Sequence, residues 1–232
     1  SPYFSLISKN FLLSAIWPPF QVFFDSCLRW FNLKVIDISI PLSPSTLLFP
    51  GDPRVEIESV SSFDQGDAYR ITRITMSAHA GTHIDTPSHI FPDGKQTEDI
   101  RLEDLVGPVF VVGFDGKQSL AASDCSRANI PLDATRVLIK NETKDAWMDQ
   151  TTARWFSERG IKLLGWEGLS IDRLDSEDLP THRTLLENGI HLVENLDLSQ
   201  VDPGHYFIVC LPLKLIGSDA SPVRAVLIED FV

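Results

Sequence analysis

The sequence predicts a single, strand-rich domain of mixed α/β architecture over residues 35–232. Three observations support this class. Short runs in which apolar and polar residues alternate recur along the region, as they do in half-buried strands. Within residues 35–232 only two windows have helical character, and a glycine closes each of them. Hydrophobic residues make up 43% of the chain and charged residues 22%, which is the usual balance of a globular protein.

Residues 1–34 are expected to form an N-terminal extension. The apolar run 11–17 is shorter than the about 20 residues of a membrane span, and Pro18 and Pro19 end it. It matches a secretory signal poorly, since no clear cleavage site follows. Aromatic residues between positions 20 and 31 then recur at helical spacing, so we expect a short amphipathic helix from Pro19 to Asn32. This helix is expected to pack on its own domain or on a neighbouring subunit.

In the first half of the domain, the sequence predicts strands and one turn between them. Residues 35–40 alternate as a strand, and 48–53 form a turn because proline and glycine are concentrated there. Residues 55–60 alternate again, and 69–76 form a further strand with one irregularity. The continuous apolar runs 109–114 and 137–140 indicate more deeply buried strands.

The second half combines helices and strands. The first helix is stopped by Gly160 and the second by Gly189, because glycine readily ends a helix. In order, we expect a helix at 151–159, a strand at 161–164, a helix at 182–187, a strand at 190–194 and a closing pair of strands at 206–216 and 223–229.

Charge and cysteine content exclude several classes of protein. Acidic residues outnumber basic ones by 32 to 20, and a net charge of −12 argues against nucleic-acid binding, which needs clustered Lys and Arg. Cys27, Cys125 and Cys210 lie far apart with no CxxC pair, so neither a disulfide framework nor a thiolate zinc site is expected. Free thiols fit a reducing compartment, and a cytoplasmic location is expected.

Three of the six histidines fall within eleven residues, together with an aspartate. Their offsets of 0, 4, 6 and 10 are all even, which places them on one face of a strand but not of a helix. A straight strand would hold the first two about 13 Å apart, too far for one ion whose nitrogen ligands lie at about 2.0–2.1 Å. The chain must therefore bend, and Gly81 is where it can. The four residues are His79, His83, Asp85 and His89.

Two histidines and a carboxylate are a recurrent ligand set for divalent ions. The sequence therefore predicts a metal site, with zinc favoured and manganese or cobalt as alternatives. Of the remaining histidines, spacing alone does not choose among His182, His191 and His205 as further ligands. It likewise leaves Glu187, Glu194 and Asp197 as competing carboxylates.

The pattern His-x-Gly-Thr-His-x-Asp-x-Pro-x-His resembles the signature of the cyclase-like metal-dependent hydrolases, which include bacterial kynurenine formamidases and isatin hydrolases. The likeness covers about residues 35–232, and it extends to the segments 37–42, 49–53, 181–182, 193–196, 212–215 and 221–225. It implies a swivelling β/β/α fold in dimers or tetramers.

The resemblance also implies roles for individual residues. His79, His83 and Asp85 would hold one ion, while His182 and Glu194 would hold a second, with Asp85 bridging the two. His89 would be the general base rather than a ligand.

The implied reaction is hydrolysis of an amide C–N bond in a small molecule, with N-formylkynurenine as the first substrate. Isatin or another cyclic amide is the alternative, and a metal-binding protein without turnover is a second alternative. Phe49, Phe63 and Trp166 are candidates for pocket aromatics. The chain departs from the family pattern at Thr86, where many members have alanine, and at 165–172 and 219–221.

Overall fold

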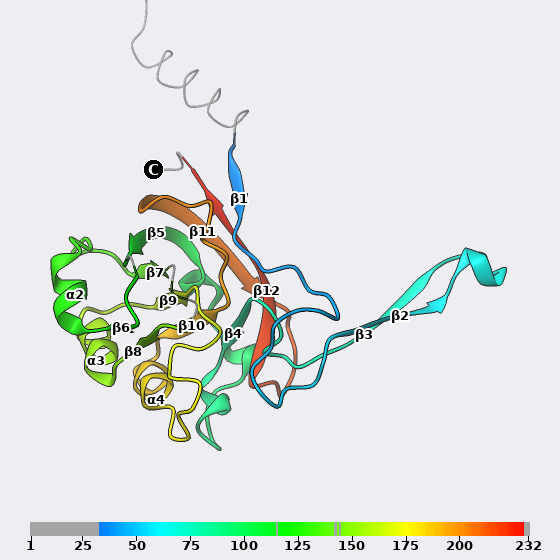
Figure 1. Ribbon diagram of the computed structural model, residues 1–232, viewed down its shortest axis with the longest axis horizontal. Helices are drawn as coiled ribbons and strands as arrows, with labels where there is room; N and C mark the ends of the chain where they lie inside the picture. The colour runs from blue at the N-terminus through cyan, green and yellow to red at the C-terminus, as the bar shows by residue number, and fades with distance from the viewer. Residues whose placement is uncertain (1–32, 115, 142, 144, 230–232) are drawn as a thin grey trace, which may run out of the picture. The chain divides into compact units, whose positions relative to one another are not determined.

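Seven strands close into a barrel-like ring in the computed structural model, which describes residues 33–114, 116–141, 143 and 145–229 (Figure 1). The ring closes because β12 pairs with β11 along one part of its length and with β4 at its beginning. In ring order the strands are β12 (Ala220–Ile228), β11 (Gly204–Pro212), β5 (Val106–Gly113), β7 (Arg136–Lys140), β9 (Leu163–Trp166), β10 (His191–Glu194) and β4 (His83–Asp85).

The ring combines parallel and antiparallel pairs. Neighbouring strands are parallel from β5 through β7 and β9 to β10. The pairs that involve β4, β11 or β12 are antiparallel. A further strand, β1 (Val35–Asp37), pairs with β12 outside the ring. Residues 35–232 form one compact unit. The predicted N-terminal helix lies outside the described residues.

Apolar residues of the parallel strands alternate between two cores, as expected for strands that are buried on both faces. In β7, Val137 and Ile139 belong to one core and Leu138 to the other. The core that contains Leu138 fills the ring and is called the inner core, and Ile84 and Val193 also belong to it. The core that contains Val137 and Ile139 lies outside the ring and is called the outer core. Residues next to Ile84 and Val193 in the chain therefore project from the outer face of the ring, where the candidate site lies.

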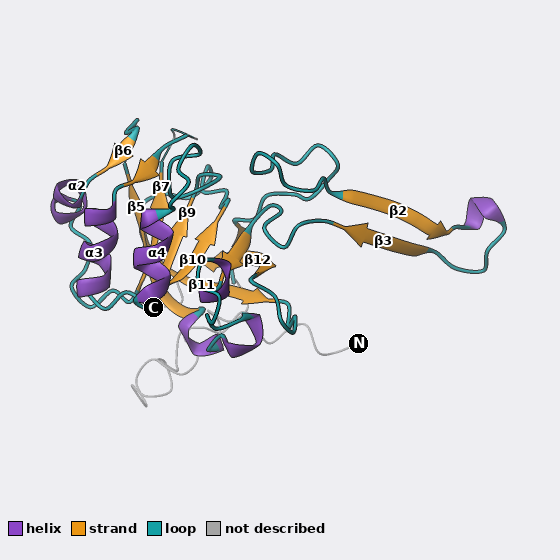
Figure 2. Cartoon of the chain, turned by 90° about the horizontal axis from the view of Figure 1, so that it is seen from below, coloured by secondary structure: helices purple, strands orange, loops and turns teal. Residues whose placement is uncertain are grey.

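Three α-helices cover the outer face of the parallel strands (Figure 2). α3 (Gln150–Glu158) begins where the Asp149 side chain accepts the N–H of Thr152, and it places Phe156 in the outer core. α4 (Pro180–Glu187) begins with a proline at its first position, which suits a helix start. α2 (Ala122–Arg127) completes this layer beside the small sheet of β6 (Ser119–Leu120) and β8 (Trp147–Met148).

A two-stranded ribbon, which we call the arm, extends away from the ring in both views (Figures 1 and 2). It consists of β2 (Glu56–Ser61) and β3 (Ile71–Thr75), joined by a segment with the short 3₁₀ helix η2 (Phe63–Gln65). Every residue of β3 is exposed. The remaining 3₁₀ helices are η3 (Pro87–His89), η4 (Thr97–Asp99) and η5 (Leu102–Asp104).

The predicted order of strands and helices is confirmed for the main elements, with shifted ends. The first strand ends at Asp37 instead of residue 40, because the chain then leaves β12 and bridges to Leu196 through Ser39. The strand predicted at 161–164 lies at Leu163–Trp166. The strand predicted at 206–216 begins earlier and ends at Pro212, whose ring leaves no N–H for further pairing.

Some elements were not predicted at all. They are α2, β6, β8 and the 3₁₀ helices, none longer than six residues. The strand expected at the histidine motif is present in part, as β4. The irregularity expected in 69–76 lies instead on its partner, where the register shifts between Ser59 and Ser61. None of the helices in the described ranges has the length and apolar character of a membrane span.

Candidate metal centre

The chain bends sharply just before β4. Gly81 has φ +67°, and a Cβ atom there would lie 2.7 Å from a side-chain carbon of Leu42. The predicted bend at Gly81 is therefore confirmed. The expectation that His79 lies on a strand is wrong, since residues 78–82 form turns and bends and the strand begins only at His83. The bend brings the rings of His79 and His83 to 5.0 Å between centroids.

The floor of the site is built by β4 and β10. His83 and Asp85 share one face of β4, and Glu194 lies opposite His83 in the antiparallel pairing. All three side chains are buried. His83 Nε2 lies 3.4 Å from Asp85 Oδ1 and 3.7 Å from Glu194 Oε2.

α4 supplies His182 from the other side. The carboxylate of Asp172 accepts the backbone N–H groups of Thr181 and His182 at the start of the helix, and it lies 2.7 Å from His182 Nδ1. Nε2 of the same ring faces inward, 3.3 Å from Glu194 Oε1 and 3.6 Å from Asp85 Oδ2. Asp172 thus caps the helix and orients the imidazole at the same time.

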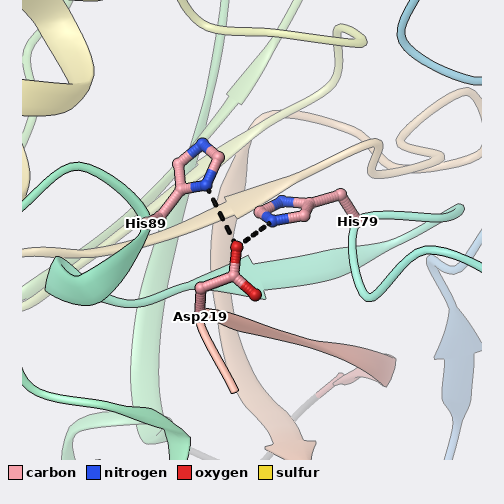
Figure 3. Close-up of side chains that lie close together, drawn as sticks. All are labelled: His79, His89 and Asp219. Carbon is pink, nitrogen blue, oxygen red and sulfur yellow. Dashed lines mark hydrogen bonds and ion pairs between the residues drawn. The ribbon is translucent and has the colours of Figure 1, made fainter. Parts of the chain in front are cut away.

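The rim of the site is more open than its floor. His79 and His89 flank the carboxylate of Asp219, as Figure 3 shows. Asp219 Oδ2 lies 3.0 Å from His79 Nε2 and 3.4 Å from His89 Nδ1. The side chain of Asp219 is 49% exposed, whereas that of Asp85 is 1% exposed. His89 reaches this position from η3, which begins at Pro87.

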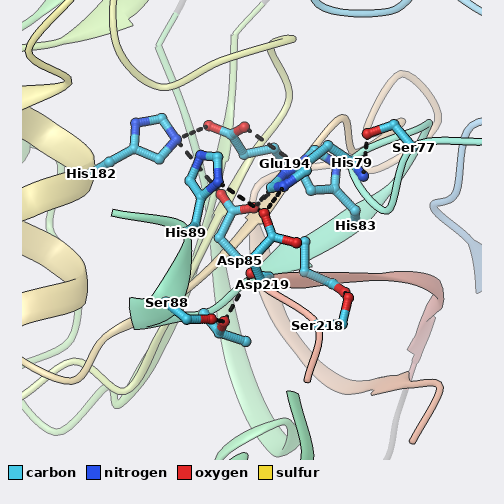
Figure 4. Close-up of polar contacts among 12 residues, drawn as sticks. Ser77, His79, His83, Asp85, Ser88, His89, His182, Glu194, Ser218 and Asp219 are labelled. Atoms are coloured by element: carbon cyan, nitrogen blue, oxygen red, sulfur yellow. Dashed lines mark hydrogen bonds and ion pairs between the residues drawn. The ribbon is translucent and has the colours of Figure 1, made fainter. Parts of the chain in front are cut away.

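The carboxylate of Asp85 tests whether these residues suit a cation. Both of its oxygens are buried, and neither has a hydrogen bond. Ring nitrogens surround it nevertheless, with His79 Nδ1 at 3.0 Å on one side and His182 Nε2 at 3.6 Å on the other (Figure 4). A buried carboxylate without a hydrogen bond is costly, so this arrangement fits a divalent cation between the carboxylate and the rings.

The tautomers of two histidines support the same fit. His83 Nδ1 lies 2.9 Å from the carbonyl oxygen of Gly81 and can only donate to it. His182 Nδ1 faces Asp172 in the same way. In each neutral ring Nε2 then carries the lone pair that faces Asp85 and Glu194, which is the arrangement of a metal-ligating histidine.

Electrostatics also favour positive charge in the centre. Burial by itself raises the pKa of Asp85, but the positive charge that His83 carries when protonated and the close approach of the neighbouring rings bring it well below its usual range. Burial lowers the pKa of His79, yet the neighbouring carboxylates of Asp219 and Asp85 raise that pKa to about 10. For His89, burial prevails and lowers the pKa, so its ring is neutral near pH 7.

Two groups of ligand atoms share Asp85. Within each group the atoms lie within 4.8 Å of one another, and the groups are His79, His83 and Asp85, and Asp85, His182 and Glu194. A third group of the same kind consists of His79, His89 and Asp219 at the rim. The six residues singled out in the sequence are therefore brought together at one centre.

A cavity of about 140 Å³ opens over this centre. Phe49 lines it, as expected, but the other two aromatic candidates do not. Trp166 is fully buried in the outer core, where it donates to the carbonyl of Ser170, and Phe63 is exposed in the arm. The lining residues are Phe49, Asp52, His79, His83, His89, Leu169, Ser170, Leu179, His182, Glu194 and Asn195.

Residues considered as alternatives lie elsewhere. His191 faces Asp104 at 3.5 Å, and the ring of His205 packs on Phe110. Glu187 is exposed at the end of α4, and Asp197 accepts the N–H of Ser199. Cys125 and Cys210 are free and buried, and burial raises the pKa of each thiol to about 12.

Sequence reasoning did not identify two functional carboxylates. Asp172 and Asp219 each contact a histidine of the centre, yet neither belongs to the histidine-rich motif. Both do fall in the two segments that depart from the family pattern, 165–172 and 219–221. The departures by themselves indicate no role for either carboxylate, because from the sequence alone they concern only the substrate.

Comparison with known proteins places the chain in a family. The family model described as "Putative cyclase" matches residues 36–173. A kynurenine formamidase of Salinibacter ruber is 35% identical over 206 residues, which cover 84% of this chain and 97% of the relative. A solved structure described as a potential metal-dependent hydrolase with cyclase activity is 32% identical, with a TM-score of 0.72, covering 85% of this chain and 98% of its own.

A third comparison concerns the fold alone. Isatin hydrolase A of Labrenzia aggregata has a TM-score of 0.72 at 23% identity, covering 90% of this chain and 98% of its own. The family model spans more than half of the sequence, and the formamidase relative covers most of it. The chain belongs to the cyclase family.

Proposed function

We propose that this protein is a metal-dependent hydrolase of amide C–N bonds, and that it converts N-formylkynurenine to kynurenine and formate. The observation that carries the proposal is the buried carboxylate of Asp85, which has histidine nitrogens on both sides and no hydrogen bond. The relatives of this protein include kynurenine formamidases such as that of Salinibacter ruber.

The residues divide into ligands and a base. His79, His83 and Asp85 would hold one divalent ion. His182 and Glu194 would hold a second, with Asp85 contributing to both, and zinc is the favoured metal over manganese or cobalt. His89 lies at the rim beside these groups and remains available for proton transfer.

A bound divalent ion supplies Lewis acidity, which lowers the pKa of water and polarises a carbonyl group. The chain's own residues then handle the proton. His89, neutral near pH 7, accepts a proton from the attacking water. The water oxygen forms a bond to the formyl carbon, the C–N bond breaks, and His89 returns the proton to the departing aryl amine. Formate and a free amine leave, so the atoms balance.

The cavity suits a substrate with one aromatic ring. Its volume of about 140 Å³ is close to the roughly 150 Å³ of an apolar cavity that holds benzene. Phe49, Leu169 and Leu179 offer apolar surface on the walls. An aryl amide therefore fits better than a long aliphatic amide or a peptide.

Isatin is the second candidate substrate, because its cyclic amide also places the scissile C–N bond beside an aromatic ring. Isatin hydrolase A shares the fold. The products distinguish the two reactions, since ring opening of isatin releases no formate.

The decisive experiment assays purified protein loaded with zinc, manganese or cobalt against N-formylkynurenine, isatin and formanilide. We expect formate release and kynurenine absorbance with the first substrate at the highest kcat/KM. Faster turnover of isatin would assign the alternative reaction. Tight metal binding with no turnover of any of the three would instead support a metal-binding protein without catalytic activity.

We also propose that the protein acts as a homodimer, with the arm as a contact between copies. Isolated two-stranded hairpins are marginally stable in water, so the arm needs a partner surface. Ile57 and Ile74 face each other across the ribbon and are 45% and 59% exposed. Ultracentrifugation of wild type and an Ile57→Asp, Ile74→Asp variant tests this, because we expect a dimer for the first and a monomer for the second. A wild-type monomer would contradict it.

A further inference from the structure

Asp219 lies between two histidines that have different functions in the proposed mechanism. One carboxylate oxygen, Oδ2, accepts from both rings, with 3.0 Å to His79 Nε2 and 3.4 Å to His89 Nδ1 (Figure 3). The two rings also pack on each other, with centroids 4.3 Å apart. A single acceptor therefore contacts a candidate ligand and the candidate base.

An ionised carboxylate can only accept, so each ring nitrogen that faces Asp219 must carry a hydrogen. In a neutral imidazole the other nitrogen then carries the lone pair. For His79 that nitrogen is Nδ1, which lies 3.0 Å from Asp85 Oδ1 at the centre. For His89 it is Nε2, on a ring that lines the cavity.

The backbone of Asp219 is fixed by Thr86, one of the residues that depart from the family pattern. The N–H and the hydroxyl of Thr86 both donate to the carbonyl oxygen of Asp219, at 3.0 and 2.8 Å. Thr86 is fully buried, and Ser88 Oγ lies 2.9 Å from its hydroxyl. Alanine at this position would keep the N–H bond and lose the hydroxyl bond.

The neighbouring peptide is held in the same way. Thr97 donates to the carbonyl of Ser218 through its N–H at 3.0 Å and its hydroxyl at 2.8 Å. Ala220 then begins β12, opposite Asp85 in β4. The segment that carries Asp219 is thus fixed at both sides of the residue.

We propose that Asp219, held in place by the hydroxyl of Thr86, is a positioning residue that sets the tautomers of His79 and His89 together. It keeps Nδ1 of His79 free for a metal ion and Nε2 of His89 free for proton transfer. The part that concerns His89 as the base rests on the proposed function, whereas the tautomers themselves do not.

Zinc-loaded full-length protein labelled with ¹⁵N-histidine provides the test, since two-bond ¹H–¹⁵N correlation spectra distinguish the tautomers. We expect the Nδ1–H form for His89 in wild type, assigned by loss of its signals in His89→Ala. In Asp219→Ala the Nε2–H form should appear, and zinc affinity should fall about 10- to 100-fold, as for other groups that orient metal ligands. Asp133→Asn removes an exposed carboxylate and is the matched control for charge.

Thr86 offers a second and milder test. Thr86→Val keeps the shape without the hydroxyl and should shift the His89 tautomer in the same direction, while Thr86→Ser should restore it. Thr152→Val is the control, because Thr152 is equally buried and donates to the carbonyl of Leu120. It should lose stability without changing the His89 spectrum.

The outcomes separate this inference from the proposed function. An Nε2–H tautomer of His89 in wild type, or an unchanged tautomer in Asp219→Ala, overturns the inference even if N-formylkynurenine is hydrolysed. The predicted spectra together with no turnover of any amide would uphold the positioning role and reject the proposed reaction.

Discussion

Glu194 lies directly opposite His83 where β10 pairs with β4, and Glu194 Oε2 is 3.7 Å from His83 Nε2. Its other oxygen lies 3.3 Å from His182 Nε2 and accepts the backbone N–H of Ile171. One strand pairing therefore joins a histidine from the ring to a histidine from a helix. Substitutions of Glu194, His83 or His182 therefore affect the same centre.

Asp85→Ala should abolish metal binding at both proposed ion positions, because Asp85 belongs to both groups of ligand atoms. Elemental analysis of protein purified without chelator measures this. Asp197→Ala removes an exposed carboxylate elsewhere and should leave the metal content at the wild-type value. A fully loaded Asp85→Ala protein would exclude the bridging role.

His89→Ala should retain the metal and lose turnover by about 10²-fold or more, the usual effect of removing an acid–base group. His205→Ala is the matched control, since its ring packs on Phe110 away from the cavity. Steady-state kinetics and metal analysis of both variants are required. Loss of metal together with activity in His89→Ala would make His89 a ligand instead.

The pH profile of kcat/KM follows from the burial of His89, which lowers its pKa below the usual 6.5. A general base works only when deprotonated, so activity rises with pH through this pKa. A bound cation would lower the same pKa further. We expect the acid limb to lie below pH 6.5 and the rate to be on its plateau at pH 7. An acid limb above pH 7 would argue against His89 as the base.

Asp172→Ala should weaken both the start of α4 and the metal centre. The backbone N–H groups of Thr181 and His182 would lose their acceptor, and a buried donor left unsatisfied costs about 1–3 kcal/mol. The His182 ring would also lose its orientation, so metal affinity should fall about 10- to 100-fold. Urea unfolding and zinc titration measure the two effects, and Asp175→Ala, an exposed carboxylate, is the control. Wild-type zinc affinity in Asp172→Ala would contradict the orienting role.

Gly81→Ala should destabilise the fold and displace His79. A left-handed backbone costs a residue with a Cβ about 1–2 kcal/mol, and here the new Cβ would also clash with Leu42. Gly160→Ala isolates the first effect, because Gly160 has φ +70° with nothing within 4 Å of its added Cβ. We expect a larger loss of unfolding free energy and of zinc affinity for Gly81→Ala. Equal losses in the two variants would show that contact with Leu42 is unimportant.

The sequence predicts the local part of the centre well. The even spacing of His79, His83 and Asp85, together with the need for a bend, leads to Gly81 without any structure. That inference works because the spacing of the side chains and the position of the glycine are both properties of one short segment. It fails only for His79, since periodicity does not distinguish a strand from the turn that precedes it.

The remote part of the centre depends on strand pairing, which local periodicity does not report. Glu194 enters the site because β10 happens to pair with β4, and nothing in its own segment separates it from Glu187 or Asp197. Only the family resemblance selected it, along with His182. Asp172 and Asp219 lie further still from any motif, and their roles arise from hydrogen bonds across the fold.

The closure of the ring by β12 has a consequence for how the protein is made. Asp219 and His79 are 140 residues apart in the sequence, and the strand that follows Asp219 is the last one of the described chain. Contacts between such distant residues form late and slow the folding of a domain. A nascent chain therefore exposes His79, His83 and Asp85 before Glu194 and Asp219 have been synthesised. Metal capture is expected to coincide with the final step of folding, as the last strand closes the ring.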